Sequence, residues 1–137
     1  TGNIGINVSI SLGGATASTG AVIINSNITT YLVEVASYLG SNKYFIDSLV
    51  TPTLTLSEGN TYIFDQSSSS NAGHPLRFST TSDGTHNSGT EYTTGVTTNG
   101  TPGSSGAYTQ IVVASGAPTL YYYCTNHSGM GGQANTP

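Results

Sequence analysis

The feature that most limits the folds open to this chain is its division into short, strand-length apolar segments separated by Gly, Pro, Asn and Ser. Alternating or briefly continuous apolar runs with turn residues at their ends are typical of β-strands, and no segment keeps a helical period. Hydrophobic residues make up 35% of the 137 residues and include nine Tyr, which is enough to fill a core rather than leave the chain disordered. The sequence predicts an all-β fold, a Greek-key β-sandwich with an N-terminal β-hairpin extension.

The strands expected in the sandwich fall between residue 30 and residue 124. Residues 67–73 are expected to form a flexible polar loop. Residues 83–105 are expected to form a long loop region that contains one short strand. The expected strands are residues 30–36, 43–47, 53–57, 60–66, 76–80, 108–113 and 119–124.

The first 29 residues form a separate segment in this interpretation, ahead of a domain at residues 30–137. Residues 3–12 alternate strictly, so one strand face would carry Ile4, Ile6, Val8, Ile10 and Leu12, and residues 21–25 can return as its partner. This hairpin either extends the sandwich or is buried against neighbouring subunits, because an isolated two-stranded hairpin is marginal in water. We expect self-association or a larger assembly through residues 1–29.

Charge and composition limit the partners and the compartment. A net charge of −4 with only two basic residues excludes a basic nucleic-acid footprint, and no apolar run is long enough for a membrane span. A single Cys cannot form an internal disulfide and does not identify the compartment. Thr, Ser, Gly and Asn make up about half of the chain, which suits an extracellular protein or a virion surface. A chain that begins at Thr1 rather than Met is expected to be a processed or excised piece.

The candidate metal ligands are Cys124, His127 and Met130, which follow a strand closely, and His74, which precedes another. Thiolate, two imidazoles and a weak axial thioether form the ligand set of a blue-copper centre. Three alternatives stay open: a buried Cys124 that acts as a small apolar residue, a zinc site, and a Cys–His nucleophile. A nucleophilic enzyme needs an orienting third group and an oxyanion site, and no motif near Cys124 supplies them, so we expect no enzyme.

The pattern Cys124-x-x-His127-x-x-Met130 with an upstream His74 resembles the cupredoxin family, and its short ligand loop looks most like those of amicyanin and pseudoazurin. The flanking segments 54–64 and 106–113 look like the family's strands. The runs His-Pro-Leu-Arg-Phe-Ser and Tyr-Tyr-Tyr-Cys are also similar, more loosely, to cupredoxin-like domains in structural proteins of marine bacteriophages.

These resemblances imply a type 1 copper site with His74, Cys124, His127 and Met130 as ligands. They imply one of three roles: part of an extracellular or virion structural protein of the fibre or filament type, a small periplasmic electron carrier, or a metal-free structural or attachment module. An electron carrier would meet its redox partner near His127.

Two departures from the family pattern stand out. The residue after the first His ligand is commonly Asn, whose backbone N–H donates to the Cys sulfur, whereas Pro75 has no N–H. The family also ends on a strand, whereas residues 131–137 are rich in Gly and polar residues, so either that strand is short or residues 30–36 take its place.

Three smaller expectations concern single side chains. Tyr122 should share a strand face with Cys124, because side chains alternate along a strand. Arg77 should pair with a carboxylate such as Asp65 or Glu91. His86 should be exposed and have no metal role.

Overall fold

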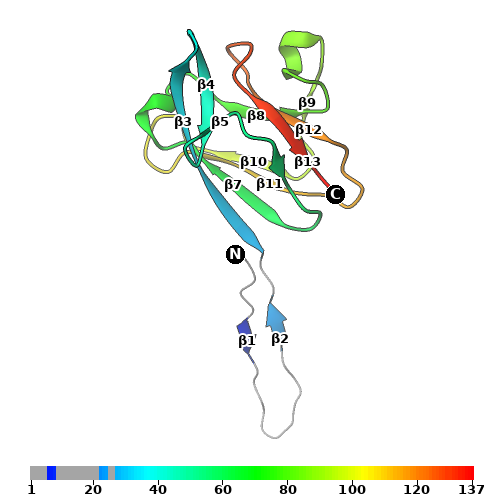
Figure 1. Cartoon of the computed structure of the whole chain (residues 1–137). Helices are drawn as coiled ribbons and strands as arrows, with labels where there is room; N and C mark the ends of the chain where they lie inside the picture. The colour runs from blue at the N-terminus through cyan, green and yellow to red at the C-terminus, as the bar shows by residue number, and fades with distance from the viewer. Residues whose placement is uncertain (1–5, 9–21, 25–26) are drawn as a thin grey trace, which may run out of the picture.

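The computed structural model describes residues 6–8, 22–24 and 27–137, and strands dominate this part of the chain (Figure 1). One sheet has six strands in the order β10-β11-β7-β3-β4-β5, and another has five in the order β6-β13-β12-β8-β9. The six strands are β3 (Ile28–Tyr38), β4 (Ser41–Ile46), β5 (Leu49–Val50), β7 (Thr61–Asp65), β10 (Val96–Asn99) and β11 (Tyr108–Val112). The five are β6 (Leu54–Thr55), β8 (Leu76–Ser79), β9 (Glu91–Tyr92), β12 (Leu120–Cys124) and β13 (Gly132–Asn135).

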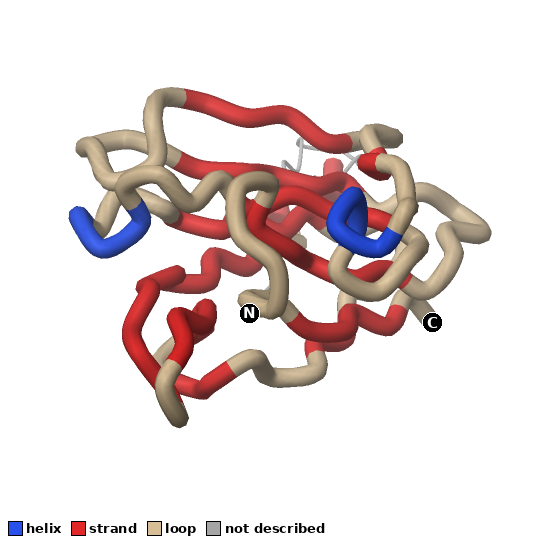
Figure 2. Tube along the Cα trace, turned by 90° about the horizontal axis from the view of Figure 1, so that it is seen from above, coloured by secondary structure: helices blue, strands red, loops and turns tan. Residues whose placement is uncertain are grey.

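The two sheets lie face to face and enclose one core, and Figure 2 shows their strands as two layers. In β7 and β11, alternate residues are buried, as the period of two requires. Phe64 of β7 meets Phe78 of β8 edge to face, with ring centroids 5.4 Å apart. Tyr44 of β4 packs near Tyr122 of β12 in a tilted arrangement, with ring centroids 6.5 Å apart. The predicted all-β sandwich is therefore confirmed.

The connections from β7 to β8, from β9 to β10 and from β11 to β12 each pass from one sheet to the other. Within the five-stranded sheet, the start of β8 and the end of β12 lie side by side, because the two strands pair antiparallel with Cys124 opposite Leu76.

The sequence left open whether the last strand is short or is replaced by residues 30–36. Gly132–Asn135 forms a short final strand, β13, which pairs antiparallel with β12 and parallel with β6. Strand β3 does not take that place, since it lies in the other sheet between β7 and β4.

Two loop predictions were wrong in detail. Residues 83–105 contain two short strands, β9 and β10, rather than one, and a 3-10 turn, η2 (Gly84–Asn87). Few apolar residues mark these strands, which is why the sequence pattern missed one. Residues 67–73 were expected to be a flexible polar loop, yet they contain the 3-10 turn η1 (Ser69–Asn71), in which Asn71 is fully buried.

The N-terminal hairpin is present as far as it is described. β1 (Ile6–Val8) pairs antiparallel with β2 (Val22–Ile24) in a two-stranded sheet of its own. The other residues of the apolar stripe, Ile4, Ile10 and Leu12, lie outside the described residues. β3 begins at Ile28, which pairs with Thr61 of β7, and the division of the chain near residue 30 stays a prediction.

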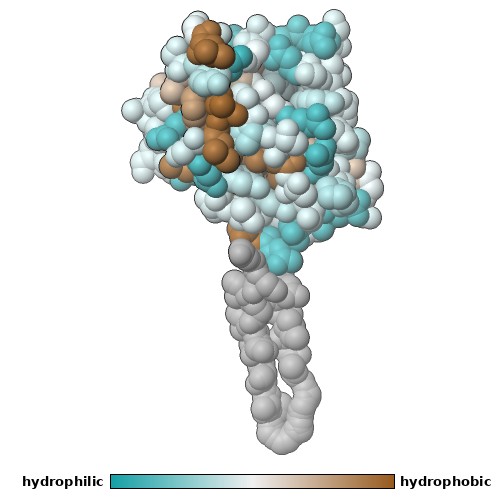
Figure 3. Space-filling model, viewed as in Figure 1, coloured by the Kyte–Doolittle hydropathy of each residue, from teal (hydrophilic) through white to brown (hydrophobic). Residues whose placement is uncertain are grey.

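Apolar side chains also reach the surface on the β3–β4–β5 side, where Figure 3 shows brown residues gathered. Leu39 in the β3–β4 turn is 88% exposed and Leu49 of β5 is 62% exposed. Within the described residues, no helix is long and apolar enough to cross a membrane.

Candidate metal site

The pairing of β8 with β12 brings His74 close to Cys124. Cys124 is the last residue of β12 and lies opposite Leu76, and just beyond it the Thr125 N–H donates to the Pro75 carbonyl at 3.2 Å. His74 lies two residues before Leu76, so it enters at the same end of the sheet. Two residues fifty positions apart therefore share one strand end.

His127 comes from the β12–β13 loop, which folds back over the end of β12. Contacts from three other segments hold this loop. Lys43 of β4 donates through Nζ to the Gly129 carbonyl at 2.7 Å. The Gly129 N–H donates to Asp83 Oδ1 at 2.9 Å, and Asn126 Nδ2 donates to the Gly73 carbonyl at 2.9 Å. The position of His127 therefore depends on both sheets and on the loop that precedes His74.

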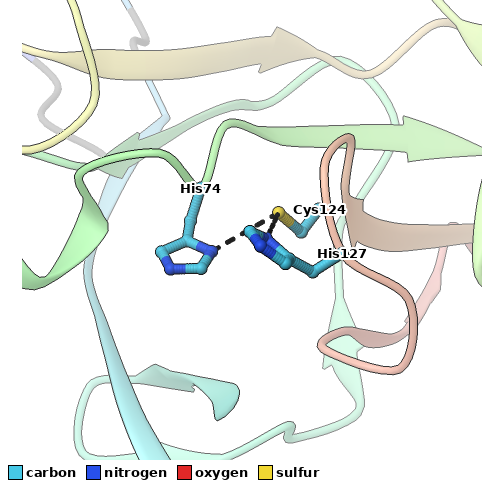
Figure 4. A group of neighbouring side chains, drawn as sticks. All are labelled: His74, Cys124 and His127. Carbon is cyan, nitrogen blue, oxygen red and sulfur yellow. Dashed lines mark hydrogen bonds between the residues drawn. The ribbon is translucent and has the colours of Figure 1, made fainter.

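The three side chains converge on a single point (Figure 4). Cys124 Sγ lies 3.7 Å from His74 Nδ1 and 3.8 Å from His127 Nδ1, and all three potential ligand atoms lie within 4.8 Å of one another. The two imidazole rings tilt toward each other with centroids 4.6 Å apart. His74, Cys124 and His127 thus form a cluster that could hold a metal ion.

These spacings suit metal coordination. A metal about 2.3 Å from sulfur and about 2.0–2.1 Å from nitrogen separates the two ligand atoms by roughly 3.6 Å at a tetrahedral angle and roughly 3.8 Å at a trigonal one. The observed sulfur–nitrogen distances of 3.7 and 3.8 Å lie in this range. Since both rings present Nδ1, both Nε2 atoms stay free to bond elsewhere.

Exposure and charge differ across the cluster. Cys124 is fully buried, His74 is half-buried and His127 is exposed. Burial, and secondarily the charge of His127, lower the pKa of His74 below its usual value. His74 is therefore neutral at neutral pH, and its ring nitrogen has a lone pair available for a metal.

A buried polar network fixes the backbone at His74. The His74 carbonyl accepts hydrogen bonds from Tyr44 Oη at 2.7 Å and from Gln66 Nε2 at 2.8 Å. Gln66 also accepts from the Leu76 N–H at 3.0 Å and donates to Asn71 Oδ1 at 3.0 Å. Asn71 donates onward to the Val33 carbonyl at 2.8 Å. This network ties the residue before β8 to both β3 and β4.

Met130 is buried and belongs to the same core cluster as Cys124. Its carbonyl accepts the Tyr44 N–H at 2.9 Å, so its backbone is held against β4. Its role as a fourth ligand stays a prediction.

The smaller expectations are largely confirmed. Tyr122 lies with Cys124 in the core. Arg77 Nε lies 3.6 Å from Glu91 Oε2, which is one of the two carboxylates expected.

His86 is exposed as predicted, but its Nε2 lies 2.7 Å from the Cys124 carbonyl oxygen. A carbonyl can only accept, so the His86 Nε2–H donates. The sequence carries no signal for this contact, because η2 reaches the end of β12 only in the folded chain. Tyr44, Gln66 and Asn71 were missed for the same reason.

No known protein-family model matches the chain, and neither does any curated protein. The chemistry of the site therefore has to be argued from its own side chains. A buried thiol between two imidazoles, one half-buried and one exposed, can hold a soft or borderline metal ion close to the surface.

Proposed function

We propose that this chain is a cupredoxin-like domain that binds a type 1 copper ion through His74, Cys124, His127 and Met130. The observation that carries the proposal is the placement of both Nδ1 atoms at 3.7 and 3.8 Å from the Cys124 sulfur. Soft sulfur with borderline nitrogen favours copper, and the thioether of the buried Met130 in the same loop would suit copper better than zinc. Bound copper would supply one-electron redox chemistry at this point.

The surrounding residues have separate tasks in this proposal. Burial of Cys124 keeps water away from the metal–sulfur bond, and the lowered pKa of His74 keeps its ring available at neutral pH. His127 is exposed, so its ring edge is the route by which an electron would reach a redox partner. The two hydrogen bonds to the Gly129 backbone, from Lys43 and to Asp83, would hold the loop in place when a metal is bound.

The wider role proposed for the domain is part of an extracellular or virion structural protein of the fibre or filament type. Two observations favour this over a diffusing electron carrier. A hairpin, β1–β2, precedes the sandwich, and only two basic and six acidic residues are available in the whole chain to steer a charged partner. A metal-free attachment module is the outcome if copper does not bind.

The copper proposal is tested by adding Cu²⁺ to the purified chain and recording the visible absorption spectrum. An intense thiolate-to-copper band is expected for the native chain, and it should be absent in Cys124→Ser and strongly weakened in His127→Ala. His86→Gln is the matched control, since the His86 ring bonds the carbonyl of Cys124 and not its sulfur, and this variant should keep the band. A native chain without such a band contradicts copper binding of this type.

The assembly proposal is tested separately by sedimentation of the full chain and of a chain that begins at Asn27. This start keeps Asn27, whose carbonyl accepts the Thr61 N–H at 2.9 Å, and all of β3. The full chain is expected to associate and the shortened chain to be a monomer that still binds copper. Monomers in both samples contradict assembly through the first 26 residues.

A further inference from the structure

The outer face of the six-stranded sheet carries a hollow that is separate from the candidate metal site. Strand β7 alternates between buried and half-buried residues, so Ile63 and Asp65 point away from the core. Strand pairing sets Thr30 of β3 beside Ile63, and it sets Tyr108 of β11 beside Asp65. Together with Ser67, these four residues line a hollow of about 150 Å³.

The size of the hollow limits what it can hold. Pockets for drug-sized ligands and cofactors measure about 300–1,000 Å³. A hollow of about 150 Å³ admits a single ring of a ligand, and the rest of that ligand has to lie along the surface of the sheet. This arrangement suits one unit of a chain molecule better than a cofactor enclosed on all sides.

The charge at the hollow excludes anionic ligands. Asp65 lines it, and neither of the two basic residues of the chain does. Lys43 Nζ donates instead to the Gly129 carbonyl, and Arg77 Nε lies 3.6 Å from Glu91 Oε2. A phosphate, sulfate or carboxylate would therefore meet a like charge without a cation to compensate it.

The Asp65 carboxylate is held in a fixed orientation. The Ser67 N–H and hydroxyl both donate to Asp65 Oδ1, at 2.9 and 2.6 Å. Within the described residues, no group donates to Oδ2, so this oxygen can accept from the hydroxyl group of a ligand. Hydrogen bonds to a charged acceptor are roughly twice as strong as neutral ones. The exposed Thr30 hydroxyl adds a neutral donor and acceptor at the rim.

The remaining lining of the hollow is apolar. Ile63 and the aromatic residue Tyr108 are both half-buried there. An aromatic ring offers a flat, largely apolar surface against which C–H groups can pack. A wholly apolar ligand would remove water from Asp65 without replacing its hydrogen bonds, which is costly. A sugar ring matches both parts of the hollow, because it carries C–H groups as well as hydroxyl groups.

We propose that this hollow binds one ring of a neutral saccharide chain. Tyr108 and Ile63 would pack against the C–H groups of the ring, and Asp65 would accept hydrogen bonds from its hydroxyl groups. This binding goes beyond the proposed function and does not depend on copper, since His74 and Cys124 flank strands of the other sheet.

The first test follows the backbone amides of the native, metal-free chain by NMR during titration with four neutral hexasaccharides: cellohexaose, chitohexaose, mannohexaose and maltohexaose. At least one of them is expected to shift the amides of Thr30, Asp65 and Tyr108. A hexasaccharide of galacturonic acid, which is anionic, should not. No shift at these residues with any of the four neutral probes overturns the inference, and so does a response there to the organic cation choline alone.

The second test measures the affinity of variants for the neutral probe that binds. Tyr108→Ala should weaken binding by about tenfold, because the packing surface is lost. Asp65→Asn keeps an acceptor for the Ser67 N–H but removes the charge, and it should also weaken binding. Tyr121→Ala is the matched control, since Tyr121 is likewise half-buried but lies on β12 in the five-stranded sheet.

Native affinity in both Tyr108→Ala and Asp65→Asn overturns the inference. If Tyr108→Ala does not fold, Asp65→Asn and the amide shifts of the native chain decide. Cys124→Ser should bind the saccharide as the native chain does, so a failure of the copper proposal leaves this inference standing.

Discussion

At the scale of single residues, the site depends on side chains whose protonation and hydrogen bonds are set by burial. The pKa of His74 is lowered by burial first and by His127 second. Asn71, Gln66 and Tyr44 are buried polar groups that each have a partner in the network beneath His74. The contribution of each of these residues to stability can therefore be measured by substituting it alone.

The metal-free protein should lose stability when the pH falls below the ordinary histidine value of 6.5. His74 binds its proton less readily in the folded chain than in the unfolded chain, so the unfolded state binds more protons in this window and the free energy of unfolding drops with pH. Urea unfolding between pH 8 and about pH 5 measures this dependence. It should be smaller in His74→Asn, and an equal dependence in both proteins would contradict the assignment to His74.

Asn71→Ala should destabilise the chain by about 1–3 kcal/mol, because it leaves the buried Val33 carbonyl without this donor and removes a partner of Gln66. Asn87→Ala is the matched control, since Asn87 is exposed and its side-chain hydrogen bond to the Ser82 carbonyl is long at 3.3 Å. The control should change stability by no more than about 0.5 kcal/mol. Equal effects in thermal unfolding would show that the network does not hold η1.

At the scale of elements, the β12–β13 loop determines whether His127 meets Cys124. The loop turns at Gly129, where φ is +76°, and then runs close to the backbone of β12. A side chain at Gly131 would overlap the Tyr122 carbonyl oxygen. The glycine at 131 is therefore required by the close approach of the loop to the strand, and not by its own backbone angle.

Gly131→Ala should displace the loop and weaken copper binding, because the added methyl group forces the segment between His127 and β13 away from β12. Titration of the chain with Cu²⁺, followed by the visible band, measures the loss. Gly116→Ala is the control: its backbone has φ +76° and the change is strained, yet no atom lies within 4 Å of the added carbon and the residue is in the β11–β12 turn. Equal copper affinity in the two variants would show that the loop tolerates displacement.

At the scale of the whole molecule, the candidate metal site lies between the two sheets, at one end of the sandwich. His74 precedes β8 and Cys124 ends β12 in one sheet, while Tyr44 and Lys43 of β4 support the site from the other. Unfolding separates these strands and disperses the ligands. A metal that binds only the assembled site must therefore stabilise the entire fold.

Copper should raise the melting temperature of the chain. By mass action, a ligand at about 100 to 1,000 times its dissociation constant stabilises the native state by about 2.7 to 4.1 kcal/mol. Cys124→Ser should lose most of this gain while its metal-free form stays folded. Calorimetry with and without copper measures the difference, and equal melting temperatures would rule out tight binding to the native state.

Much of the fold and of the candidate site could be predicted from local pattern. Alternation along the strands indicates which side chains point inward, which is why the segments around Phe64, Phe78 and Tyr122 were identified correctly. The spacing of Cys124 and His127 predicts that both face one point. Weakly apolar strands such as β9, β10 and β13 depend on their neighbours for pairing, so their own residues predicted them poorly.

The sequence by itself determined the types of potential metal ligand and their order: one thiol, an imidazole three residues after it, and a distant imidazole before another strand. Only the tertiary structure decided which other residues surround these potential metal ligands. Tyr44, Gln66, Asn71 and His86 reach the site from other strands and turns, because strand pairing and sheet packing bring together residues far apart in the chain. Hydrogen bonds and burial depend on those distant neighbours, and no local pattern encodes them.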